Sequence, residues 1–64
     1  MTKVRNNYTK EVVYFRFFVT KQFDDCFWYT RTTDNFGFEM GFTKNFTPLK
    51  KSWKEIRNET TKMG

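Results

Sequence analysis

The sequence predicts a small α+β fold in which an antiparallel meander of three to four strands packs on one C-terminal helix. Three segments, 10–20, 26–32 and 36–43, alternate between two sets of side chains with a period of two, as strands do. The segment 48–60 has the spacing of an amphipathic helix instead. Nine phenylalanines, a single leucine and no alanine leave aromatic rings as the main material for a core.

The length of the chain, 64 residues, predicts a single small domain, 1–64, because a second hydrophobic core does not fit in it. Residues 1–9 are mostly polar, and Asn6 and Asn7 tolerate the positive φ of a tight turn. We expect this segment to be either a short edge strand or a mobile basic arm. The meander then covers 10–43.

The two-residue repeat gives each strand a core face and an opposite face. The third segment divides most clearly, because its large apolar residues alternate with Gly37, Glu39 and Gly41. The register of the middle segment is left open by the sequence. The predicted core face consists of Val13, Phe15, Phe17, Val19, Trp28, Phe36, Phe38, Met40 and Phe42.

The helix is predicted to begin at Thr47 and Pro48. Threonine caps free backbone N–H groups, and proline is tolerated at the first helical position because its missing donor costs nothing there. Leu49, Trp53 and Ile56 then stack on one side at about 100° per residue. This apolar stripe is expected to cover the sheet.

The same helix is charged asymmetrically. Thr60 and Met63 extend its apolar line, and Glu55 and Glu59 lie on one flank. The other flank is basic, and it is predicted to be a solvated face or, alternatively, a phosphate-binding ridge; it consists of Lys50, Lys54 and Arg57.

The net charge of +5 favours an acidic partner, and single-stranded nucleic acid and an acidic host protein both fit this charge. No apolar run approaches the roughly 18 residues of a membrane span, and no signal peptide is recognisable. We therefore expect a cytoplasmic protein without a membrane partner. The abundance of Phe, Lys, Asn and Thr without alanine is typical of AT-rich genomes. This composition suggests an accessory protein of a phage, virus or plasmid, acting in the host cytoplasm.

The residue inventory argues against an enzyme. No histidine is present, so Cys26 and the only serine, Ser52, lack the usual general base. Asp24 and Asp25 are adjacent in a loop, where extended neighbours point to opposite sides and do not converge on one bond. The sequence contains neither a zinc-ligand pattern nor a glycine-rich loop before a helix, so we expect no metal and no cofactor. Cys26 is expected to be a structural residue.

The face opposite the predicted core carries more rings than a solvent-facing surface usually does. Only one helix is predicted, and it cannot cover both faces of the sheet. We therefore predict that the aromatic and arginine residues of this face bind a partner. They are Tyr14, Arg16, Phe18, Phe27, Tyr29 and Arg31.

Two functional classes compete for this predicted binding face. Exposed rings stack on unpaired bases while arginines contact phosphates, so binding of single-stranded DNA or RNA is the first prediction, and the positive charge favours it. Tyr, Trp, Phe and Arg also dominate protein interfaces, so a regulator or inhibitor of a host protein is the alternative. A homodimer that buries the face as a scaffold is a third interpretation.

Overall fold

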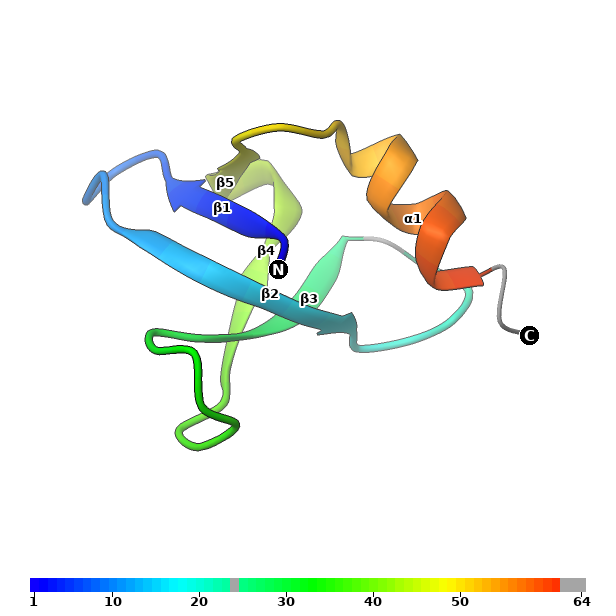
Figure 1. Cartoon of the computed structure of the whole chain (residues 1–64). Coiled ribbons are helices and arrows are strands. Elements are labelled where there is room, and N and C mark those ends of the chain that lie inside the picture. Colours follow the sequence, from blue (N-terminus) through cyan, green and yellow to red (C-terminus); the bar gives the residue numbers. More distant parts are fainter. Residues whose placement is uncertain (24, 62–64) are drawn as a thin grey trace.

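The computed structural model describes residues 1–23 and 25–61 and confirms the α+β class (Figure 1). Within these residues five antiparallel strands form one sheet, which is one or two strands more than the sequence predicts, and a single helix follows them. The strands are β1 (Lys3–Asn6), β2 (Val12–Phe18), β3 (Cys26–Thr30), β4 (Glu39–Phe42) and β5 (Phe46–Pro48). A 3₁₀ turn, η1 (Thr43–Asn45), separates β4 from β5, and the helix α1 covers Trp53–Thr61.

The strand order is β4-β3-β2-β1-β5, so the N-terminal segment forms an inner strand of the sheet. Val4 of β1 lies opposite Val13 of β2 on one side and opposite Pro48 of β5 on the other. In the turn to β2, the side-chain oxygen of Asn6 accepts the backbone N–H of Tyr8 at 2.8 Å. This segment is therefore the predicted short strand and not a mobile arm, but it is an inner strand rather than an edge strand.

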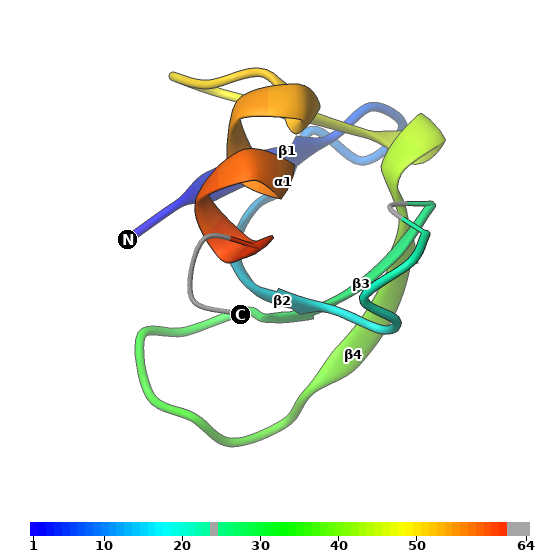
Figure 2. The ribbon, with the colours of Figure 1, turned by 90° about the vertical axis from the view of Figure 1, so that its right-hand side faces the viewer.

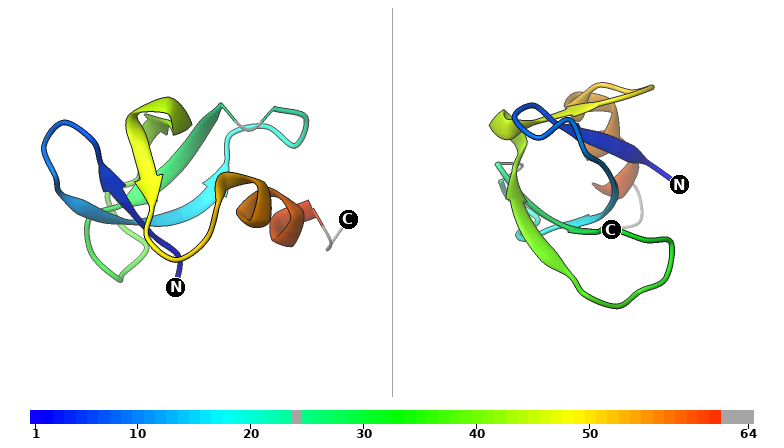
Figure 3. Two further views of the ribbon diagram at one scale, coloured as in Figure 1. Left: turned by 90° about the horizontal axis from the view of Figure 1, so that it is seen from above. Right: turned by 90° about the vertical axis from the view of Figure 1, so that its left-hand side faces the viewer.

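The sheet curls because η1 connects its two outermost strands. Five flat strands at a spacing of about 4.8 Å would place β4 about 19 Å from β5. The connection from Phe42 to Phe46 can extend at most about 14 Å. The strands therefore close into an incomplete ring, with the β1–β2 turn at one end and α1 at the other (Figure 3).

A β-bulge in β2 changes which residues point inward. Phe15 lies opposite Tyr29 and Phe17 lies opposite Trp28, so Arg16 is an extra residue in the ladder. The alternation shifts by one position at this point. Phe15 and the residue three positions later, Phe18, are therefore both buried, whereas Phe17 is exposed.

The core lies inside the curled sheet, with the fully buried ring of Phe27 at its centre. The centroid of this ring is 5.0 Å from that of Trp53 on α1 and 5.2 Å from that of Phe46 on β5. Helix and sheet thus share one aromatic cluster, and Figure 2 shows α1 at one end of the curled sheet. The buried apolar residues are Val4, Val13, Phe15, Phe18, Phe27, Tyr29, Phe46 and Ile56, with Trp53 packed against them.

The predicted core face is wrong for β3 and β4, whose two faces are exchanged. Gly41 points inward, because an added Cβ there would lie 2.8 Å from Cε1 of Phe46 and 3.2 Å from Cζ of Phe27. The ring of Phe46, from a strand that the sequence did not predict, fills the inward side of β4. The residues predicted to be buried that lie outside the core are Phe17, Val19, Trp28, Phe36, Phe38, Met40 and Phe42.

The helix begins five residues later than predicted, because Pro48 belongs to β5. Ser52 precedes the helix, and its Oγ accepts the backbone N–H of Glu55 at 3.1 Å. Trp53 and Ile56 pack on the core as predicted, whereas Leu49 is exposed. Thr60 is exposed, and the predicted extension of the stripe to Met63 lies outside the described residues.

Candidate functional site

Three of the six residues predicted to bind a partner are core residues. Phe18, Phe27 and Tyr29 are less than a tenth exposed. The β2 bulge turns Phe18 inward, and β3 has the opposite orientation to the predicted one. None of these rings can stack on a ligand in this fold, so the predicted binding face does not exist as a surface.

Arg16 lies on the outer side of the sheet, where it holds the β3–β4 loop. Its Nε donates to the hydroxyl of Thr30 at 2.9 Å, and Nη2 donates to the carbonyl oxygens of Thr33 and Asp34, each at 2.8 Å. A weaker bond from Nη2 to the carbonyl of Thr32 measures 3.2 Å. This guanidinium group is therefore committed to the loop rather than presented to a ligand.

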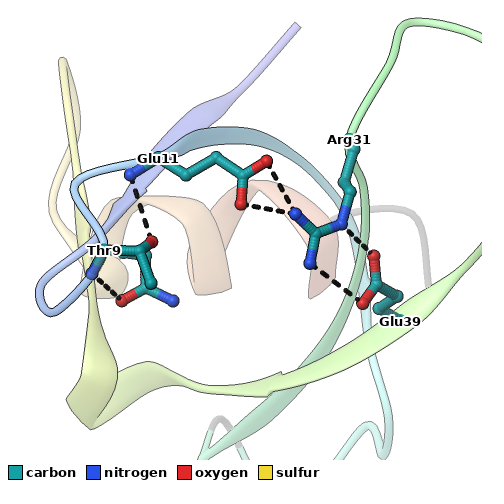
Figure 4. A network of polar contacts seen from close by, with 5 residues as sticks. Thr9, Glu11, Arg31 and Glu39 are labelled. Atoms are coloured by element: carbon teal, nitrogen blue, oxygen red, sulfur yellow. Dashed lines mark hydrogen bonds and ion pairs between the residues drawn. The ribbon is translucent and has the colours of Figure 1, made fainter.

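Arg31 forms a bridge between two carboxylates (Figure 4). Its Nη1 donates to Glu11 at 2.6 Å, and its Nε donates to Glu39 at 2.6 Å. The hydrogen bond with Arg31 lowers the pKa of Glu39, and the two carboxylates raise the pKa of Arg31. Burial raises the pKa of the neighbouring Tyr29. Arg31 thus joins β3, β4 and the start of β2, and its charge is balanced locally.

Tyr14 is the one predicted ring that lies on the outer side of the sheet, where it is half-buried. It lies opposite Lys3 of β1, and the Nζ of Lys3 is 5.9 Å from the centroid of its ring. This distance is within the range of a cation–π contact.

The three predicted basic helix residues do not form one flank. Lys50 precedes the helix, whereas Lys54 is exposed on it. The guanidinium carbon of Arg57 is 5.2 Å from the centroid of the Phe18 ring, and its Nη1 donates to the carbonyl of Thr20 at 3.3 Å. Arg57 therefore attaches the helix to the end of β2.

A row of exposed apolar residues lies on the outer side of β2, β3 and β4. Phe17, Trp28 and Met40 lie opposite one another in a row across the three strands. The ring of Phe38, just before β4, lies 5.7 Å from that of Phe17. We call the following five residues the outer apolar face: Phe17, Trp28, Phe38, Met40 and Phe42.

The exposure of the outer apolar face is large for such side chains. Phe17 is 50% exposed, Met40 49% and Phe42 43%, while Trp28 is half-buried. Cys26 lies opposite Phe42 and is half-buried at the margin of this face. All five residues were predicted from the sequence to be core residues. The signal that could have corrected this was Gly41, because a glycine within an aromatic-rich strand often marks a close approach of another group.

A second surface feature is a groove of about 210 Å³ between the N-terminal segment and the connection from β5 to α1. Lys51, at its rim, forms an ion pair with Glu59 at 2.7 Å. The groove combines apolar and basic side chains. It is lined by Met1, Thr2, Lys3, Leu49, Lys50 and Lys51.

Comparison with known proteins finds no matching family model, no similar curated protein and no similar solved structure. Within 1–23 and 25–61, no helix is long and apolar enough to cross a bilayer. Among the same residues, no group of three or more acidic, cysteine or histidine side chains is arranged to hold a metal ion.

Proposed function

We propose that this protein is a non-enzymatic binding protein that attaches to a partner protein through the outer apolar face. One observation carries the proposal. Five large apolar side chains, four from neighbouring strands and one from the residue just before β4, lie together on the outer side of the sheet and outside the core. Exposed patches of this kind usually mark binding surfaces. Trp, Phe and Met are also enriched at protein interfaces.

The engagement of the arginines favours a protein partner over single-stranded nucleic acid. A stacking surface for bases needs cations beside its rings to contact the phosphates. On this surface Arg16 is committed to the β3–β4 loop, and Arg31 is paired with Glu11 and Glu39. The outer apolar face itself carries no charged residue.

The proposed partner is an acidic protein, for which the net charge of +5 provides long-range attraction. The same charge disfavours a second copy of the chain, because two such molecules repel each other. Composition supports a role as an accessory protein of a phage, virus or plasmid, and the proposed partner is then a protein of the host cytoplasm.

Single-stranded nucleic acid is retained as the second candidate because of another observation. Lys3 and Tyr14 form a cation–ring pair on the outer side of the sheet, and Arg5 of β1 is also exposed. A ring beside cations is the combination that contacts a base and its phosphate.

The test is affinity capture from a lysate of the cells in which the protein occurs, carried out with and without nuclease. Met40→Glu places a charge in the outer apolar face, and Tyr8→Glu is the matched control, since Tyr8 is 78% exposed in the β1–β2 turn. We expect a captured protein that is lost with Met40→Glu and kept with Tyr8→Glu. Capture that survives Met40→Glu, or that disappears with nuclease, would contradict the proposal. A dimer that Met40→Glu dissociates would assign the face to a second copy.

A further inference from the structure

The direction of the backbone groups in β4 can be derived from two hydrogen bonds beside it. The N–H of Val19 donates to the carbonyl of Cys26 at 3.1 Å, so Cys26 directs its backbone groups toward β2. The N–H of Thr43 donates to the carbonyl of Asp25 at 2.9 Å, so Asp25 directs its carbonyl toward β4. In an antiparallel ladder, successive residues direct their backbone groups to alternate sides.

This alternation determines which groups of β4 face the open edge. Phe27 lies two positions after Asp25, so it also directs its backbone groups toward β4. Its partner on β4 is Gly41, and these two residues exchange backbone hydrogen bonds. Met40 and Phe42 therefore direct their N–H and C=O groups away from β3. In the strand order, β4 is outermost and pairs with β3 alone among the described strands. The C=O of Phe42 is used by the first i→i+3 turn of η1, so the open groups at this edge are the N–H and C=O of Met40 and the N–H of Phe42. The side chains of both residues lie on the outer apolar face, and these open groups lie at its rim.

The two edges of the sheet differ in how well they are protected. Edge strands are usually shielded by proline, by lysine, or by being very short. β5 has three residues and includes Pro48, which lacks an N–H group. β4 contains neither proline nor lysine, and its one charged residue, Glu39, is paired with Arg31. The unprotected edge is thus the one that borders the outer apolar face.

We propose that the partner contributes an extended segment that pairs with β4 and adds a sixth strand to the five-stranded sheet. Alternate apolar side chains of this segment would cover Met40 and Phe42, while its backbone pairs with the N–H and C=O of Met40 and with the N–H of Phe42. This inference rests on the proposed function. The segment belongs to an acidic protein rather than to a second copy, because Lys44 follows this edge in η1 and the whole chain carries a charge of +5.

The test repeats the capture experiment with the variants Met40→Pro and Met40→Ala. The probe is the protein that the unmodified chain still captures after nuclease treatment. Proline removes the outward N–H group, and the β3–β4 ladder does not use this group. Alanine removes more of the side chain but keeps the N–H group. We expect Met40→Pro to bind at least about tenfold more weakly than Met40→Ala. Circular dichroism melts confirm that both variants are folded.

The possible results separate the inference from the proposed function. Loss of the probe with Met40→Glu, but equal binding by Met40→Pro and Met40→Ala, overturns strand pairing and leaves the partner protein in place. If no captured protein depends on the outer apolar face for its retention, both the strand pairing and the proposed function are overturned.

Amide hydrogen exchange provides a second measurement. In the free protein, the amide of Gly41 is expected to exchange slowly and those of Met40 and Phe42 rapidly. In the complex, the latter two should become protected at least about tenfold. Unchanged exchange at both positions, with the probe bound, would contradict strand pairing.

Discussion

Replacement of Gly41 by alanine tests the orientation of β4 through the sign of its effect. On an open strand face, glycine to alanine stabilises by about 0.5 to 1 kcal/mol because it reduces the entropy lost on folding. In this structure the added methyl group would lie 2.8 Å from Cε1 of Phe46 and 3.2 Å from Cε2 of Tyr29. Buried rings would therefore have to move to make room for this methyl group.

These rings have little room to move. The Phe46 centroid is 5.2 Å from that of Phe27 and 5.3 Å from that of Tyr29, and the carbonyl of Phe46 accepts the indole N–H of Trp53 at 3.1 Å. Overpacking of this kind costs about 1 to 3 kcal/mol. For a domain of this size the midpoint of thermal unfolding should fall by about 5 to 20 °C.

Urea unfolding followed by tryptophan fluorescence gives the free energy directly. Phe46→Leu removes the ring that Gly41→Ala would contact, so the double variant should lose less stability than the sum of the two single variants. A Gly41→Ala protein that is as stable as the unmodified chain, or more stable, would refute the inward orientation of Gly41.

Three further results are expected. Arg16→Met should accelerate amide exchange in the β3–β4 loop and lower the unfolding free energy by about 1 to 3 kcal/mol, because the loop carbonyls lose their donor. The lowered pKa of Glu39 means that its pairing with Arg31 stabilises the fold fully above the ordinary glutamate pKa of about 4.3 and is lost as the pH falls through the lower folded value. Urea unfolding of Arg31→Gln should therefore depend less on pH in this acidic range. Finally, if a fluorescent oligonucleotide of about 12 nucleotides binds, its affinity should fall as the salt concentration rises. Replacement of Lys3 should reduce this salt dependence, and replacement of Met40 should leave it unchanged.

The sequence was sufficient for the elements whose signals are local. Alternation predicted three of the five strands, and helical spacing placed Trp53 and Ile56 on the core. The short strand β5 has only three residues and ends at a proline, so its local pattern resembles a helix start. Its pairing with β1 is a long-range contact that no local pattern encodes.

The candidate site was missed because the sequence does not distinguish the two faces of β3 and points to the wrong face of β4 as the buried one. Rings alternate with rings in β3, so periodicity cannot decide which set is buried. In β2 the bulge at Arg16 breaks the two-residue repeat, and nothing in the local sequence marks it. In β4 the inward position is a glycine, so the more apolar side of the strand lies outside. The residues of the outer apolar face were thus recognised as important, but for packing rather than for binding.

Truncation of two adjacent residues of β3, Phe27 and Trp28, tests the central claim most directly. Phe27 is fully buried, so Phe27→Ala should cost about 3 to 5 kcal/mol and leave a domain of this size largely unfolded. Trp28 is half-buried on the outer apolar face, so Trp28→Ala should cost at least about 2 kcal/mol less and leave a folded chain that no longer retains its partner. The opposite result, a stable Phe27→Ala protein and an unfolded Trp28→Ala protein, would show that the faces of the sheet are assigned the wrong way round.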